Sequence, residues 1–120
     1  MKRTAWKNRI IKACKEAGTY REFFNVIIDT LAEILEKRDE VAKEYKDRGG
    51  KALVEYTNKG GSTNLTKNPA LTLWDDLNKS ALAYWRDLGL TPAGLKKIDE
   101  SAMQKKRKSG LLEALEELGG

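Results

Sequence analysis

Apolar residues between positions 19 and 48 recur at three- and four-residue steps, and this pattern is the strongest constraint on the fold of the chain. Ile27, Ile34 and Val41 follow a seven-residue step, and further apolar residues flank this row on both sides. The spacing predicts one helix over 19–48, about 40 Å long, which a glycine pair ends. Its apolar stripe is broader than a two-stranded coiled-coil seam, so the helix must pack against at least one neighbour.

Helix-start and helix-stop signals define the first two helices. Thr19 and Glu22 stand three residues apart and predict a capping box at the start of the long helix. Thr4 is expected to cap an earlier helix, which lies within 1–18 and carries many basic residues. Gly18 is expected to end that helix as its C-terminal cap.

Two proline-initiated helices follow later in the chain. An Asn-Pro pair predicts a helix over 68–88, and a Thr-Pro pair predicts a shorter one over 91–104. Two helices joined by a short glycine turn are typical both of DNA-reading helix-turn-helix units and of packed helical corners. The second helix offers Lys96 and Lys97, but no Arg, Asn or Gln near its start. That surface is poor for reading bases, so a structural corner is the preferred interpretation.

The connector and the end of the chain complete the predicted architecture. Residues 51–67 show no helical period, and a weak alternation before an Asn-Lys-Gly-Gly-Ser run favours a short β-hairpin at about 52–66 over a loop. Residues 105–120 read as a basic linker and an amphipathic tail. We expect a mainly α fold with a single helical domain over 1–104. It comprises a long antiparallel helix pair, a basic N-terminal helix, the hairpin or loop, and a short C-terminal helical corner.

Charge and composition limit the function classes. The 120 residues include 23 Lys and Arg against 18 Asp and Glu, and the net charge of +5 favours an acidic partner such as nucleic acid. There is no histidine and only one cysteine, so we expect no zinc site, no cofactor and no enzyme activity. No apolar run is long enough to span a bilayer or to act as a signal peptide. We therefore expect no membrane partner and a cytoplasmic location.

Basic residues gather near both ends of the chain. From Met1 to Lys15 there are six basic residues and no acidic one, which favours phosphate contact over a solvated basic face. Such contacts position a protein on DNA without reading its sequence. A second basic group precedes the tail and ends at Lys108. The predicted DNA-binding residues are Lys2, Arg3, Lys7, Arg9, Lys12, Lys15, Lys105, Lys106 and Arg107.

Large apolar side chains at helical spacing predict subunit contacts rather than a base-stacking platform. The predicted oligomer-interface residues are Phe24, Ile27, Leu31, Ile34, Trp74, Leu77, Tyr84 and Trp85. The tail carries leucines on one side of a helix too short to be stable by itself in water. A partner-binding helix and a helix docked on its own domain are both open for these residues, Leu111, Leu112, Leu115 and Leu118.

Much of the chain resembles a known family. The segments "YREFFNVIIDTLAEILEKRDEVAKEY" and "VEYTNKGGSTNLTKNPALTLWDDLNKSALAYWRDLGLTPAGLKKI" resemble the terminase small subunit of tailed bacteriophages and prophages. The resemblance covers about residues 20 to 100, and its most specific parts are the Asn-Pro helix start and "LGLTP", residues 88–92. Family members often carry an Arg shortly after this motif, where the present chain has Leu95 and Lys96.

The resemblance implies a non-catalytic DNA-packaging factor that works in the cytoplasm of the bacterial host. Small terminase subunits recognise double-stranded viral DNA and pass it to the large subunit, which carries the ATPase and the nuclease. They also regulate that subunit, and they work as ring-shaped homo-oligomers. On this interpretation the two long helices build the ring, and the tail from Leu111 to Leu118 contacts the large subunit. A small helix-turn-helix transcription regulator is the alternative, and a structural adaptor without a DNA role is a third class.

Overall fold

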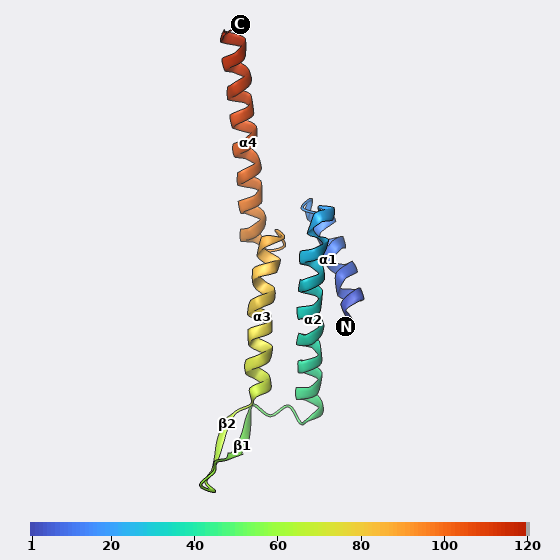
Figure 1. Ribbon diagram of the computed structural model, residues 1–120, viewed down its shortest axis with the longest axis vertical. Coiled ribbons are helices and arrows are strands. Elements are labelled where there is room, and N and C mark those ends of the chain that lie inside the picture. The colour runs from blue at the N-terminus through green and yellow to red at the C-terminus, as the bar shows by residue number, and fades with distance from the viewer. Residues whose placement is uncertain (120) are drawn as a thin grey trace.

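The computed structural model describes residues 1–119, apart from the side chain of Lys106. In chain order the elements are α1 (Arg3–Ala17), a 3-10 turn η1 (Glu22–Phe24), α2 (Asn25–Asp47), β1 (Leu53–Thr57), β2 (Thr63–Lys67), α3 (Pro69–Asp87) and α4 (Pro92–Gly119). The chain is therefore mainly α, with one two-stranded hairpin between long helices, as the sequence predicted (Figure 1).

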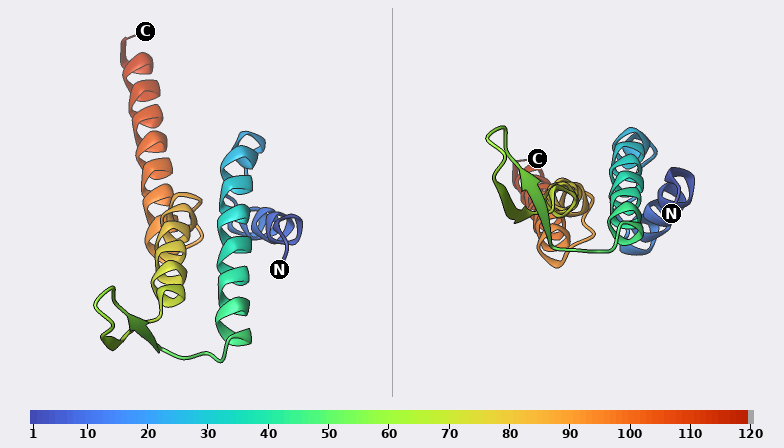
Figure 2. Two further views of the ribbon diagram at one scale, coloured as in Figure 1. Left: turned by 60° about the horizontal axis from the view of Figure 1, so that its bottom comes forward. Right: turned by 90° about the horizontal axis from the view of Figure 1, so that it is seen from below.

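The helices α2 and α3 run antiparallel side by side, and α1 packs on another side of α2 (Figures 1 and 2). The broad apolar stripe of α2 explains this arrangement, because the helix must cover two neighbours. The side chains buried between the three helices are Ile10, Cys14, Ile28, Leu31, Ala32, Leu35, Ala81 and Leu88. The core is thus a narrow seam centred on α2.

The molecule is strongly elongated. Its principal extents are 86 × 30 × 20 Å, and its Cα radius of gyration is 22.6 Å. A compact domain of this length would have a radius of gyration of about 14 Å. Because so little of the chain folds back on itself, much apolar surface on α2, α3 and α4 stays uncovered.

The first helix begins two residues earlier than a Thr4 cap would place it. Lys2 occupies the N-cap position without a side-chain cap, and Thr4 lies inside the helix, so the predicted Thr4 cap is wrong. The helix can start without a cap because the backbone amide of Arg3 instead donates to the Glu36 carboxylate at 2.6 Å. The predicted stop at Gly18 is confirmed, with a left-handed φ of 74°.

The predicted capping box is also wrong. The helix α2 starts at Asn25, after the 3-10 turn, and Thr19 lies well before it. The Thr19 side chain is buried, and its hydroxyl donates to the Leu88 carbonyl at 2.8 Å. A buried hydroxyl needs a partner, and here a tertiary contact with the α3–α4 turn supplies it in place of a local helix cap.

The connector forms the predicted hairpin. Its two strands pair antiparallel from Leu53 opposite Lys67 to the tip, where Asn58 accepts hydrogen bonds from the amides of Gly60 and Ser62. Asn68 has two roles at the base. Its side-chain oxygen caps α3 by accepting a hydrogen bond from the Ala70 amide. Its side-chain nitrogen donates to the Lys51 carbonyl, and its backbone amide donates to the Ala52 carbonyl. The predicted Asn68 cap is confirmed.

The last helix is longer than predicted. Pro92–Gly119 is one continuous 28-residue helix, so neither a separate linker at 105–110 nor a short helical corner is present. Lys, Arg, Gln, Glu, Leu and Ala dominate this segment, and their helix propensity carries the helix through Gly110, which costs only about 1 kcal/mol. The division into a domain 1–104 and a tail 105–120 stays a prediction. Figure 1 shows α4 leading away from the helical body.

Candidate nucleic-acid and subunit interfaces

The basic residues of α1 form two groups. Arg3 and Lys7 face α2, where the side-chain nitrogen of each lies 3.9 Å from the Asp29 carboxylate. Arg9 and Lys15 instead lie over aromatic rings, of Trp6 at 5.7 Å and of Tyr20 at 5.1 Å. A basic residue that already faces a carboxylate is a weaker phosphate ligand than one that faces solvent.

The solvent-facing group consists of Arg9, Lys12 and Lys15, and we call it the outer basic face of α1. The remaining predicted residue in this region, Lys2, is exposed but precedes the helix and lines a hollow together with Glu36 and Glu40 of α2. All three residues of the outer basic face are exposed, and none of them makes an ion pair within the described part of the chain. The helix presents them outward because Ile10 and Cys14 occupy its inner side and are buried against α2. Burial raises the pKa of the Cys14 thiol, which keeps it a neutral core residue.

Asp39 is the polar residue that fixes α1 on α2. Its carboxylate accepts hydrogen bonds from the Trp6 indole at 2.7 Å and from the Met1 amino group at 3.1 Å, and it pairs with Arg38 at 3.1 Å. Burial by itself would raise the pKa of Asp39, but these hydrogen bonds outweigh it and hold the pKa below its ordinary value. The orientation of the outer basic face therefore depends on an α2 carboxylate that sequence reasoning did not single out.

Arg38 connects all three helices. Its guanidinium lies 5.4 Å from the Trp6 ring and donates to the Asn78 side chain of α3 at 3.2 Å. The only sequence signal for this role is the position of Arg38. It stands at a seven-residue step between Leu31 and Tyr45, in a row whose other members are apolar or aromatic. A half-buried arginine that stacks on an aromatic ring can bridge neighbouring helices in this way.

The predicted oligomer-interface residues lie at different depths. Leu31 is completely buried at 0% exposure, so it belongs to the core of a single copy and presents no surface to a second one. Ile27 and Trp74 keep 40% and 42% of their surface exposed. The remaining predicted residues, Phe24, Ile34, Leu77, Tyr84 and Trp85, are half-buried.

Exposed apolar residues that the sequence reasoning missed lie beside the predicted set. Phe23 in the 3-10 turn and Val26 at the start of α2 are 74% and 78% exposed, and Leu73 and Leu82 of α3 are also exposed. A wider apolar arc on each helical wheel would have included them. These side chains are typical of a surface that contacts another protein subunit.

The helix α4 changes its apolar side along its length. Leu95 and Ile98 lie near the α3–α4 turn, and sixteen residues at about 100° each place Leu111 almost half a turn away from Leu95. All four predicted tail leucines, Leu111, Leu112, Leu115 and Leu118, are exposed by 55 to 86%. Of the predicted basic group, Lys105 and Arg107 are exposed, and the Lys106 side chain lies outside the described residues.

No chemistry-bearing cluster accompanies these surfaces. Within residues 1–119, no three His, Cys, Asp or Glu side chains gather as a metal site would require. None of the described helices has both the length and the apolar character needed to cross a membrane. The surfaces that the described residues do present are basic on α1 and apolar on α2, α3 and the end of α4.

Comparison with known proteins identifies the family. No curated protein and no solved structure matches the chain. A family model described as "Phage terminase, small subunit" matches residues 3–105, which span α1 through the first half of α4. The match covers most of the chain and includes the antiparallel helix pair together with Arg9, Lys12 and Lys15. The chain belongs to the phage terminase small subunit family.

Proposed function

We propose that this protein is a non-catalytic DNA-binding factor of a phage or prophage, which recognises double-stranded viral DNA and regulates the large terminase subunit during genome packaging. It would do so in the cytoplasm of the bacterial host. The family match supports this role. The observation that carries the DNA-binding part is the outer basic face of α1.

The outer basic face fits a phosphate backbone. Lys12 and Lys15 are exposed on the same helix as Arg9, and no acidic residue precedes Glu16 in the chain. Each lysine that binds a phosphate releases condensed counterions, so the binding constant falls as salt rises. Contacts of this kind would position the protein on DNA, and sequence preference would come from the shape or bending of the duplex.

We also propose that several copies assemble into a ring through α2 and α3. Ile27, Trp74 and Leu73 leave apolar surface exposed on the antiparallel pair, and the elongated body buries too little of it. A second copy that covers these side chains would contribute about 25 cal/mol for each Å² of apolar surface removed from water. Assembly would also support the hairpin, because a two-stranded hairpin is only marginally stable without packing.

The leucines of α4 are the proposed contact for the large subunit, which carries the ATPase and the nuclease. The alternative interpretation of the sequence is that these leucines dock on their own domain. The exposure of Leu111 to Leu118 and the direction of α4, away from the body, favour the partner (Figure 1). A helix of this kind would lay its apolar side into a groove of the partner.

The helix-turn-helix alternative has weaker support. In both Figure 1 and Figure 2 the helix α4 continues in broadly the same direction as α3, whereas a DNA-reading unit crosses its two helices at a steep angle. The turn itself is occupied by protein contacts, since Leu88 is buried and its carbonyl accepts from Thr19.

DNA binding across a salt series tests the proposal. Removal of α1 would open the core around Ile10, so point substitutions are the better probe. We expect Lys12→Ala/Lys15→Ala to lower the slope of log K against log salt by about 0.9 for each phosphate that the variant no longer neutralises. The control Lys37→Ala/Lys79→Ala removes two lysines that already face carboxylates on the same helix, and its slope should stay unchanged.

Two results of this experiment would count against the proposal. Wild-type protein without salt-dependent DNA binding would refute the DNA-binding role as a whole. Normal DNA binding with an identical slope in the Lys12→Ala/Lys15→Ala variant would remove only the assignment of the outer basic face.

A further inference from the structure

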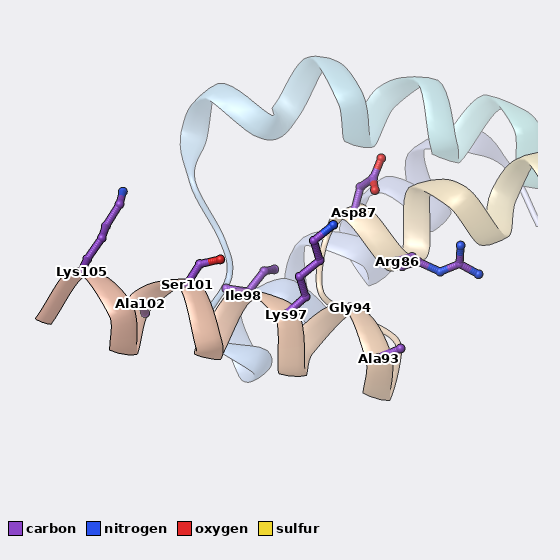
Figure 3. Close-up of a pocket in the computed structure, with 9 residues that line it drawn as sticks. All are labelled: Arg86, Asp87, Ala93, Gly94, Lys97, Ile98, Ser101, Ala102 and Lys105. Atoms are coloured by element: carbon purple, nitrogen blue, oxygen red, sulfur yellow. The ribbon is translucent and has the colours of Figure 1, made fainter. Parts of the chain in front are cut away.

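A groove of about 670 Å³ lies where the end of α3 meets the first half of α4. Arg86 and Asp87 contribute from α3, and Lys97, Ser101 and Lys105 contribute from α4 (Figure 3). The charged ends of the two lysines project together from α4, whereas the Arg86 guanidinium points away from them (Figure 3). Apolar side chains, Ala93, Ile98 and Ala102, also line the groove.

Helical spacing explains why one side of α4 is basic here. Lys97, Ser101 and Lys105 follow one another at four-residue steps, so they share a side of the helix, and Figure 3 shows their side chains projecting from it together. Gly94 brings this side close to α3, because a Cβ at Gly94 would collide with the Arg86 carbonyl oxygen. Gly94 therefore allows α4 to approach α3 closely, and this approach shapes the groove.

The opposite side of α4 provides an internal comparison. The groove there is lined by Lys96 and Arg107 together with Asp99 and Glu100, so its charges balance. Lys96 also lies 4.0 Å from the Glu100 carboxylate. On the first side, by contrast, no ion pair within residues 1–119 involves Arg86, Lys97 or Lys105.

We propose that the groove lined by Arg86, Lys97, Ser101 and Lys105 is a second nucleic-acid site, which holds the phosphate backbone of the DNA. The inference rests on the proposed DNA-binding function and adds a site to it. Unpaired cations beside a hydroxyl donor suit phosphate oxygens, whereas a protein surface that binds apolar partners would need fewer charges at its centre.

The dimensions of the groove fit this ligand. Lys97 and Lys105 are eight residues apart, which is about 12 Å along the helix axis. That length matches the rise of about three to four phosphates on one strand of a duplex, at 3.4 Å each. Asp87 stands at the α3 end of the groove, so the α4 lysines are expected to bind most of the phosphate.

The groove also lies at the end of the body where α1 terminates. Thr19 lies two residues past the end of α1, and its hydroxyl donates to the carbonyl of Leu88, one residue past α3, at 2.8 Å. The α1–α2 loop and the α3–α4 turn are therefore held together.

Binding of a labelled random-sequence duplex to full-length protein tests the site, between about 50 and 200 mM salt. We expect Lys97→Ala/Lys105→Ala to lower the salt slope by about 1.8, at 0.9 for each of two phosphates. The charge-preserving Lys97→Arg/Lys105→Arg variant should keep the wild-type slope. The matched control Lys79→Ala/Lys96→Ala removes two lysines that face carboxylates, one of them adjacent to Lys97, and should also leave the slope unchanged.

The outcomes separate this inference from the proposed function. Absence of salt-dependent binding in the wild type would refute both. Wild-type binding with an unchanged slope in Lys97→Ala/Lys105→Ala would overturn the groove site and leave the outer basic face standing. An equal decrease in the Lys79→Ala/Lys96→Ala control would reveal a general charge effect and overturn the site as well. Unchanged DNA binding together with abolished binding of polyglutamate would assign the groove to an acidic protein segment instead.

Discussion

Replacement of Gly89 by alanine tests how the α3–α4 turn is built. Gly89 has a left-handed φ of 72° and is buried beneath the α1–α2 loop. A Cβ at this position would lie 2.7 Å from Ile98 Cδ1 and 2.9 Å from Thr19 Cγ2. Both distances are shorter than ordinary van der Waals contact. The substitution therefore strains the backbone and overpacks the junction at the same time.

Gly18 provides a matched control. Its φ is 74°, almost the same as that of Gly89, but nothing lies within 4 Å of its hypothetical Cβ. Gly18→Ala should cost only the backbone penalty of about 1–2 kcal/mol. Gly89→Ala should cost the same penalty plus about 1–3 kcal/mol of overpacking, or about 2–5 kcal/mol in total. The difference between the two variants isolates the packing of the junction.

The assay is urea denaturation at one fixed protein concentration, because assembly would otherwise contribute to the apparent stability. A second substitution sharpens the test. Thr19→Ser removes the crowded methyl group but keeps the hydroxyl that bonds to Leu88, so Gly89→Ala/Thr19→Ser should recover part of the stability that Gly89→Ala removes. Equal destabilisation by Gly18→Ala and Gly89→Ala, with no recovery in the double variant, would refute this account of the turn.

Three further substitutions test other parts of the structure. Leu31→Ala should lower the free energy of unfolding by about 2–5 kcal/mol in urea denaturation, because Leu31 is fully buried in a small core. Asp39 has a lowered pKa, so its stabilising effect is present above its unfolded pKa of about 4 and is lost as pH falls through the lower folded value. Asp39→Asn should therefore melt earlier at neutral pH and show a flatter acid-side profile than wild type, whereas parallel profiles would contradict the role of Asp39. Leu115→Glu should reduce stimulation of the large-subunit ATPase while DNA binding stays normal, since Leu115 is exposed at the far end of α4. Full stimulation by that variant would contradict the proposed partner surface.

Local signals predicted much of the fold. The Asn68 cap, the Gly18 stop and the hairpin all depend on residues close in sequence, and all three are present in the structure. Thr4 and the Thr19–Glu22 pair also match local helix-start patterns, yet neither threonine caps a helix. Thr19 is used instead by a contact with Leu88, 69 residues away, which no local pattern encodes.

The candidate surfaces were harder to predict. Sequence periodicity indicates that a side chain belongs to an apolar stripe, but it does not divide the stripe between the core and the surface. Leu31 and Ile27 occupy similar stripes on α2, yet one is fully buried and the other is 40% exposed. The division depends on where α1 and α3 cross α2. Likewise, the basic run near the N-terminus predicted the charge of α1, but only the structure shows that Arg3 and Lys7 face Asp29.

The native mass of the purified protein tests the central claim most directly, namely that the exposed apolar surface of α2 and α3 is covered by further copies of the chain. Light scattering coupled to size-exclusion chromatography measures that mass independently of the elongated shape. We predict one species whose mass is a ring-sized multiple of the 13.5 kDa chain, and a shift towards smaller species in the Ile27→Asp variant. A wild-type protein that remains a 13.5 kDa monomer at every concentration tested would contradict the account.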